Sequence, residues 1–131
     1  RVQQLLLSRV EAVLRPSGLT FARFEVLRLL GFTRTGTLPI GKIGERLQVH
    51  AASVTNAVGR LEADGLVARS PNPDDGRSVL VSLTDEGRRA VEAATELLND
   101  QVFTQLPIPT DAQREVFAAL RDVRAAFGDF A

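Results

Sequence analysis

Apolar residues recur through the first half of the chain at three- and four-residue spacing, which is typical of helices that bury one face. Such positions run from Val2 to Leu14, from Phe24 to Leu30, from Ile40 to Leu47 and from Val54 to Leu61. The first two intervals between them contain proline, glycine and threonine, which favour helix ends and loops. The pattern therefore predicts four helices before residue 66.

Several residues at the ends of these helices have known terminal preferences. Thr20 is placed to cap the second helix, and Pro39 suits the first position of the third, where its missing N–H would be unpaired anyway. Gly65 follows the fourth helix, where glycine commonly ends helices. Gly41 and Gly44 lie inside the third helix, where each costs about 1 kcal/mol of helix propensity relative to alanine. We therefore expect both to let the helix backbone approach its neighbour closely.

The next stretch has the period of a strand rather than of a helix. Residues 66–83 read LVARSPNPDDGRSVLVSL, in which Val79, Val81 and Leu83 alternate along one face. Turn-forming residues interrupt its middle: Pro71, Pro73, Asp74, Asp75 and Gly76. This arrangement predicts a β-hairpin with Arg77 beside its turn.

Helical spacing resumes after the hairpin. Thr84 can cap a long helix, with Asp85 and Glu86 in its first turn, where carboxylates offset the helix dipole. The apolar positions of this helix are Val91, Ala94, Leu98 and Val102. Residues 110–113, Thr-Asp-Ala-Gln, match the capping box that begins a helix. The apolar positions of this last helix are Val116, Leu120, Val123 and Phe127.

Composition narrows the classes of protein that fit this pattern. The 131 residues, 44% of them hydrophobic, suffice for one domain with its own core. The absence of cysteine excludes disulfides and cysteine-ligated zinc. No apolar run approaches the roughly 18 residues that span a bilayer, so we expect a cytoplasmic protein without a membrane partner. The chain begins with Arg1 inside a helical pattern, from which we expect that its natural N-terminus is missing.

The candidate catalytic and cofactor signals are weak. Residues 36–42 match the GxxxxGK spacing of a phosphate-binding loop, but Ile43 stands where a hydroxyl should bind magnesium, and a helix precedes the motif. The only histidine, His50, lacks an evident nucleophile or carboxylate arrangement. We therefore expect no enzyme activity, no cofactor and no metal.

Two short helices followed at once by a hairpin describe a winged helix-turn-helix. From Leu38 to Gly87 the chain resembles the MarR family of bacterial transcription regulators, most specifically in RLEADGLVARSPNPDDGRSVLVSLTDEGRRAV. The resemblance implies a mainly α fold with a small β-hairpin wing and terminal dimerisation helices. It implies one MarR-like domain over 1–131, a DNA-binding lobe at 20–87, and dimerisation helices at 1–15 and 88–131.

The resemblance also implies that the fourth helix reads the major groove of DNA. The candidate contacts that its apolar face leaves free are Ala52, Ser53, Thr55, Asn56 and Arg60. The same residues would suit an ordinary solvated helix surface. His50 precedes this helix and is a candidate either for a phosphate contact or for a cap.

In this family an arginine near the wing tip enters the minor groove, and the resemblance assigns that role to Arg77, held in position by Asp75. A narrow minor groove attracts a guanidinium because its negative potential is strong. The alternative is a surface ion pair worth under about 1 kcal/mol. Arg69 at the wing base is a further candidate for phosphate contact. So are Arg88 and Arg89, for which solvated helix charge is the alternative.

Homodimer formation is implied for the terminal helices, whose apolar residues exceed what one small lobe needs. They are Leu5, Leu6, Val13, Leu120, Val123, Phe127 and Phe130. Closure of a monomer core is the alternative. The resemblance further implies a small aromatic effector, with Phe21, Phe24 and Arg28 as candidate ligand contacts. Core packing is the alternative for the two phenylalanines.

The resulting hypothesis is a sequence-specific regulator, a repressor, that binds a pseudo-palindromic double-stranded operator. The competing hypothesis is a winged-helix protein-interaction module that does not bind DNA. The 16 basic and 16 acidic residues cancel, so the net charge provides no general attraction to nucleic acid.

Overall fold

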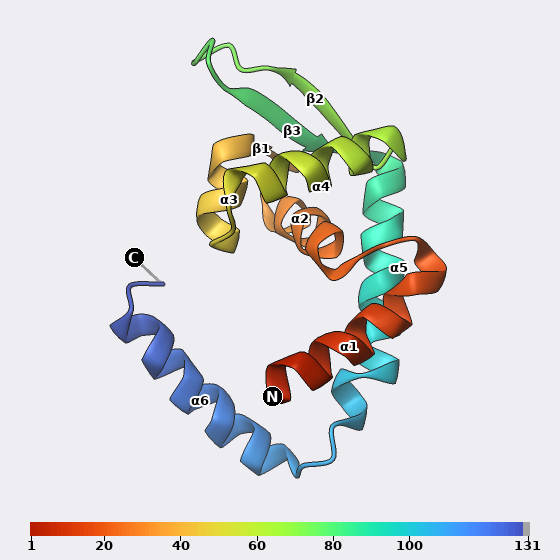
Figure 1. Cartoon of the computed structure of the whole chain (residues 1–131), viewed down its shortest axis with the longest axis vertical. Coiled ribbons are helices and arrows are strands. Elements are labelled where there is room, and N and C mark those ends of the chain that lie inside the picture. Colours follow the sequence, from red (N-terminus) through yellow and green to blue (C-terminus); the bar gives the residue numbers. More distant parts are fainter. Residues whose placement is uncertain (130–131) are drawn as a thin grey trace.

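The protein is described by a computed structural model over residues 1–129, which is mainly helical with one small antiparallel sheet (Figure 1). The elements in chain order are α1 (Val2–Leu14), α2 (Phe21–Phe32), β1 (Thr37–Pro39), α3 (Ile40–Leu47), α4 (Ala51–Ala63), β2 (Val67–Pro71), β3 (Val79–Leu83), α5 (Asp85–Gln101) and α6 (Thr110–Ala126). This is a winged helix-turn-helix with helices at both ends.

Two of the predicted helix caps are confirmed. The Thr20 hydroxyl accepts the Arg23 N–H at 3.3 Å, and the Thr84 hydroxyl accepts the Gly87 N–H at 3.0 Å. Each oxygen satisfies a backbone donor that the first helical turn leaves without an intrahelical partner. Gly65 follows α4 with a φ of +75°, as its position predicted.

The capping box predicted at Thr110 is wrong. Pro109 is the N-cap of α6, so Thr110 lies in the first turn, and no side chain caps the helix. The Gln113 N–H bonds to the Pro109 carbonyl at 3.0 Å, and the Gln113 side chain donates to the Ile108 carbonyl at 2.9 Å. The pre-set φ of proline moves the helix start by one residue and leaves the threonine hydroxyl without its expected role.

The sheet contains a strand that was not predicted. Its strand order is β1-β3-β2, with both neighbours antiparallel to β3. Pro39, expected at the first position of a helix, instead ends β1 opposite Leu80, and α3 begins at Ile40. Three residues are too few to show an alternating pattern, so only the pairing with β3 reveals this strand.

The core lies where α1, α2, α3, α4 and α5 meet the sheet. Its members that are fully buried include Leu14, Leu27, Leu30, Ile43, Leu61, Val81 and Leu98. All four apolar positions predicted for α5 are buried, which confirms its inward face. No helix among residues 1–129 is both long and apolar enough to cross a membrane.

Helix α6 runs apart from this core (Figure 1) and contains no buried residue. Of its predicted apolar stripe, Leu120 is 58% exposed and Phe127 is 85% exposed. In α1, Leu5 is also 65% exposed, whereas Val13 packs against the core. Phe130 lies outside the described residues. The α6 part of the terminal stripe therefore does not close the core of this single chain, whereas Val13 contributes to it.

Glycine permits close packing at two positions, of which the sequence predicted one. At Gly44 a Cβ would lie 3.3 Å from Val54 Cγ2, so the predicted close approach is confirmed. At Gly41 a Cβ would meet no atom within 4 Å, so that prediction is wrong. The tightest approach is at Gly87, where a Cβ would lie 2.0 Å from the Leu66 carbonyl oxygen.

Candidate nucleic-acid interface

Helix α4 presents one polar face to solvent because its apolar face is fully used in the core. Val54, Val58 and Leu61 are buried. The five residues predicted to contact bases, all exposed, are Ala52, Ser53, Thr55, Asn56 and Arg60. Burial of the apolar face of α4 in the core therefore leaves the polar face exposed.

His50 is the N-cap of α4. Its Nδ1 accepts the Ala52 N–H at 3.3 Å, so of its two predicted roles the structure shows the cap. Because this bond uses Nδ1 as the acceptor, the other ring nitrogen, Nε2, carries the proton in the neutral side chain. His50 as a whole is exposed at the beginning of α4.

A groove separates the N-terminus of α2 from the exposed face of α4. Its volume is about 480 Å³, and it is lined by Thr20, Ala22, Arg23, Ser53, Asn56, Ala57 and Arg60. The groove thus brings Arg23, which sequence reasoning did not select, beside three of the predicted contacts. The Arg23 Nε donates to the Thr20 hydroxyl at 3.1 Å, and its Nη1 lies 3.8 Å from the Asp64 carboxylate.

The wing tip is held by side chains that bond to backbone. The Asp75 carboxylate accepts the Arg77 N–H at 3.0 Å, and the Asn72 side-chain oxygen accepts the Asp74 N–H at 3.0 Å. Asp75 was expected to hold Arg77 in position, and it bonds to the Arg77 backbone rather than to the side chain. Within residues 1–129 no ion pair joins the two side chains, because a short aspartate reaches the backbone two residues on more easily than a distant guanidinium. Arg77 itself is exposed.

Arg69, expected to be available to phosphate, is paired with Glu62 of α4. The Arg69 Nη2 and Nε lie 2.6 and 2.8 Å from Glu62 Oε2, and the Arg69 backbone N–H donates to Glu62 Oε1 at 3.3 Å. The hydrogen bond from Arg69 lowers the pKa of Glu62 below its usual value. The wing base is therefore locally neutral and tied to α4.

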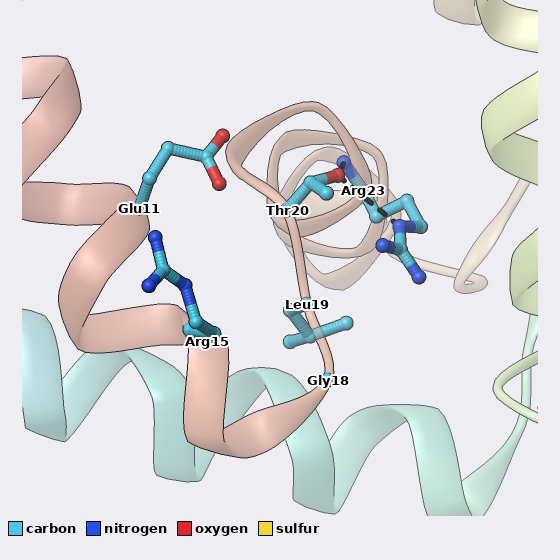
Figure 2. Close-up of a pocket in the computed structure, with 6 residues that line it drawn as sticks. All are labelled: Glu11, Arg15, Gly18, Leu19, Thr20 and Arg23. Atoms are coloured by element: carbon cyan, nitrogen blue, oxygen red, sulfur yellow. Dashed lines mark hydrogen bonds between the residues drawn. The ribbon is translucent and has the colours of Figure 1, made fainter.

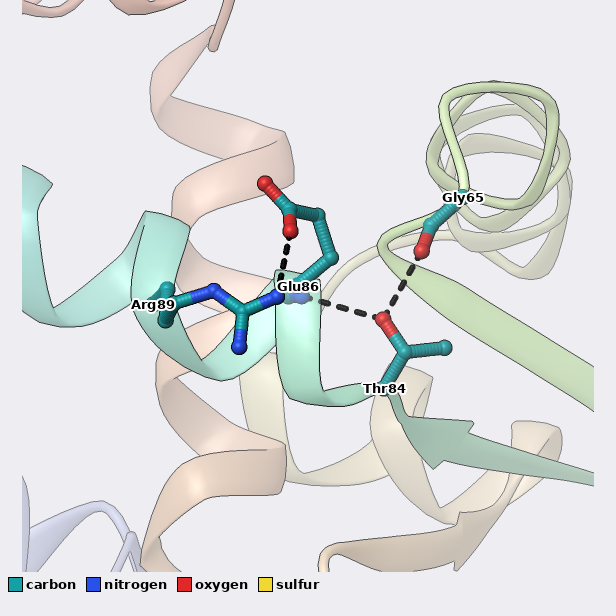
Figure 3. Close-up of polar contacts among 5 residues, drawn as sticks. Gly65, Thr84, Glu86 and Arg89 are labelled. Carbon is teal, nitrogen blue, oxygen red and sulfur yellow. Dashed lines mark hydrogen bonds and ion pairs between the residues drawn. The ribbon is translucent and has the colours of Figure 1, made fainter.

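The two arginines that follow the wing differ in their surroundings. Arg89 Nη2 donates to Glu86 Oε2 at 2.6 Å along α5 (Figure 3), which fits the alternative of ordinary helix charge. Arg88 is exposed on the same helix. No ion pair within residues 1–129 involves Arg88, so of these two arginines it is the one that offers a charge next to the wing.

The candidate ligand residues lie on α2. The rings of Phe21 and Phe24 stack with centroids 6.4 Å apart, and both pack against the core. The Arg28 guanidinium lies 4.3 Å from the ring centroid of Phe32, so this cation is already in contact with an aromatic face.

A separate cavity lies between the end of α1 and the start of α2. Its volume is about 230 Å³. Figure 2 shows Glu11 and Arg15 on one side of it and Thr20 and Arg23 on the other. Glu11 Oε1 accepts the Phe21 N–H at 2.8 Å, which links the two helices. The predicted ligand residues do not line this cavity.

Comparison with known proteins agrees with this geometry. The MarR family model matches residues 19–79, which run from the start of α2 into β3. An HTH-type transcriptional repressor from Mycobacterium bovis is 31% identical over 118 residues, which cover 88% of this chain and 82% of that relative.

Two solved structures extend the comparison to almost the whole chain. A MarR family transcriptional regulator from Streptomyces coelicolor is 52% identical, with a TM-score of 0.91 over 99% of this chain and 90% of that one. A mutant MarR from E. coli in complex with operator DNA is 27% identical, with a TM-score of 0.84 over 93% of this chain and 87% of that one. The chain therefore belongs to the MarR family, and it is a transcriptional regulator rather than an enzyme.

Proposed function

We propose that this regulator is a homodimeric repressor that binds a pseudo-palindromic, double-stranded operator. The observation that carries the proposal is the division of α4, whose apolar residues are buried while the five predicted contacts are exposed. A similar fold, that of the mutant E. coli MarR, is solved with operator DNA, and the relative from Mycobacterium bovis is named a repressor.

In this proposal α4 enters the major groove and Arg77 enters the adjacent minor groove. Asn56 has the amide that pairs bidentately with adenine, and Ser53 and Thr55 have hydroxyls that suit bases or phosphates. Arg60 lines the groove beside α4 and supplies positive charge next to the phosphate backbone, whereas Arg23 in the same groove lies 3.8 Å from the Asp64 carboxylate. The lobe at 20–87 would act on DNA, while 1–15 and 88–131 would hold the dimer.

The second copy of the chain is the proposed partner of α6. Val116, Leu120, Val123 and Phe127 recur at three- and four-residue spacing on this helix, and all are more than half exposed. A stripe with this spacing packs against another helix, and no helix in the described part of the chain, residues 1–129, covers it. A two-fold dimer would also present two α4 helices to successive major grooves, as palindromic sites require.

A small aromatic effector remains part of the proposal. Phe21, Phe24 and Arg28 follow one another at three- and four-residue spacing, so they share a face of α2. Two aromatic rings and a guanidinium on one face suit an aromatic anion. Bound between the lobe and the dimer helices, such a ligand would change the DNA affinity by favouring one arrangement of the two lobes. Work on chromosomal DNA would place the protein in the cytoplasm.

Salt-dependent DNA binding separates this proposal from a protein-interaction module. Duplexes selected by the protein from a random pool are labelled, and binding is followed by fluorescence anisotropy at several salt concentrations. We expect saturable binding to two-fold symmetric sequences, with a logarithmic salt slope of several units because each phosphate contact contributes about −0.9. Binding no tighter than to random duplex at every salt concentration would instead favour the interaction module.

A further inference from the structure

The end of α4 and the start of α5 meet at one side chain, that of Thr84. Its hydroxyl accepts the Gly87 N–H of α5 at 3.0 Å and donates its own proton to the Gly65 carbonyl at 2.8 Å (Figure 3). Gly65 is the second residue after α4, and it is separated from Thr84 by the whole wing. One oxygen atom therefore connects the first turn of α5 to the backbone that follows α4.

Further contacts limit movement at this junction. The Thr84 N–H donates to the Leu66 carbonyl at 3.2 Å, and Val67 pairs with Leu83 at the base of the wing. Gly87 leaves no gap, because a Cβ there would lie 2.0 Å from the Leu66 oxygen. The first turn of α5 thus rests directly on the backbone that follows α4.

A small change of angle at this junction produces a larger displacement at the far end of α5. Helix α5 has 17 residues and is about 25 Å long at 1.5 Å per residue. A tilt of about 10° at its start would displace its far end by about 4 Å, which exceeds the rise of about 3.4 Å per base pair along one strand of DNA. A small rotation between α4 and α5 would therefore change the distance between two α4 helices in a dimer by the length of a base pair.

We propose that Thr84 is a positioning residue that sets the operator half-site spacing accepted by the homodimer. It does so because its hydroxyl fixes the angle between α4, which is proposed to read the DNA, and α5, which leads to the dimer helices. The inference rests on the proposed function, since spacing has meaning only for a dimer on a two-fold site.

A simpler role for Thr84 is that of a helix cap alone. Loss of a threonine cap costs about 1 kcal/mol of stability. That loss would weaken binding to every duplex by the same factor and would leave the preference for one spacing unchanged. The ratio of affinities for two spacings therefore separates positioning from capping.

Substitution of Thr84 by aspartate tests the two hydrogen bonds of the hydroxyl separately, because aspartate can make only one of them. In Thr84→Asp the carboxylate still accepts the Gly87 N–H, and aspartate is at least as good a cap as threonine. It has no proton to donate to the Gly65 carbonyl, so it removes that hydrogen bond alone, while the Thr84 N–H still bonds to the Leu66 carbonyl. Thr84→Ser retains both bonds and is the matched control. Thr84→Val keeps the shape, removes both bonds and replaces the aspartate variant if thermal unfolding shows that variant to be unfolded.

The probes are the palindromic duplex that the full chain selects from a random pool and the same duplex with one base pair inserted at its centre. For wild type and Thr84→Ser we expect the inserted duplex to bind about tenfold more weakly, an effect like that of a mismatched base pair. For Thr84→Asp we expect the ratio to fall below about threefold, because without the hydroxyl bond to Gly65 the angle between α4 and α5 varies more and suits both spacings.

The outcomes distinguish this inference from the proposed function. An unchanged ratio in folded Thr84→Asp, or a wild type that does not discriminate between spacings, would overturn the positioning role while leaving DNA binding intact. A wild type that selects no duplex would overturn the proposed function, and the inference with it.

Discussion

The Glu62 carboxylate of α4 binds both the guanidinium and the backbone N–H of Arg69 in β2. One acidic side chain thereby neutralises the arginine at the wing base and satisfies an edge-strand donor. The two arginines of the wing are consequently not equivalent, although both were selected from the sequence. Arg77 keeps an exposed side chain at the tip, whereas Arg69 is held against α4.

This difference predicts unequal effects on the salt dependence of DNA binding. We expect Arg77→Ala to reduce the magnitude of the logarithmic salt slope by about 1, the value for one lost phosphate-region contact. Arg69→Ala should change the slope by clearly less, because Glu62 already compensates that charge. Anisotropy titrations at four or more salt concentrations measure both slopes. Equal reductions would show that Arg69 leaves Glu62 when DNA binds.

The pH dependence of stability should differ in sign at two glutamates. Burial raises the pKa of Glu25, and its carboxylate has no hydrogen-bond or ion-pair partner among residues 1–129. Its contribution to stability is therefore fully present below the unfolded pKa near 4.5 and is lost as pH rises through the higher folded pKa. We expect Glu25→Gln to gain stability relative to wild type at pH 7, and the gain to shrink toward pH 4.

Glu62→Gln should show the opposite pH dependence to Glu25→Gln. The pKa of Glu62 is lowered by Arg69, so its stabilisation is present above about pH 4.5 and is lost as pH falls through the folded pKa. This variant should be less stable than wild type at pH 7 and should approach wild type in acid. Urea unfolding from about pH 2 to pH 7 measures both differences, because the change at Glu62 lies below its ordinary pKa. Parallel trends for the two variants would contradict the assignment.

Two glycines in helices should respond in opposite ways to alanine. In Gly87→Ala the new Cβ would overlap the Leu66 carbonyl oxygen at 2.0 Å. We expect this overpacking to lower the free energy of unfolding by about 3 kcal/mol. Gly41→Ala meets no atom within 4 Å and should raise it by about 0.5–1 kcal/mol through helix propensity. Urea denaturation tests both, and a neutral Gly87→Ala would mean that α5 moves away from Leu66 at little cost.

Dimer formation should depend on one face of α6. Leu120→Asp places a charge in the exposed apolar stripe, and we expect it to raise the dimer dissociation constant by about tenfold or more. Ala118→Asp adds the same charge at an exposed position on the opposite side of the helix and should leave the constant near that of wild type. Sedimentation equilibrium measures both variants. Equal constants for Leu120→Asp and wild type would exclude this stripe from the interface.

Much of the fold and of the candidate site was predictable because the information is local. The apolar period placed the helices, and the positions of Thr20 and Thr84 predicted caps that the structure contains. The exposed face of α4 follows from the same period, since Val54, Val58 and Leu61 must point inward together. The family resemblance could be seen for the same reason, because the motif that carries it is one continuous stretch of the sequence.

The tertiary structure decided the features that depend on residues distant in sequence. The three residues of β1 have no period of their own and become a strand only by pairing with β3. Arg23 reaches the groove beside α4 because α2 packs there, and Glu62 captures Arg69 because β2 folds back along α4. The sequence by itself determined which helices and faces form, since local spacing governs them. Only the packing of separate elements decided which charges are neutralised, which glycine must remain a glycine and how α4 is joined to α5.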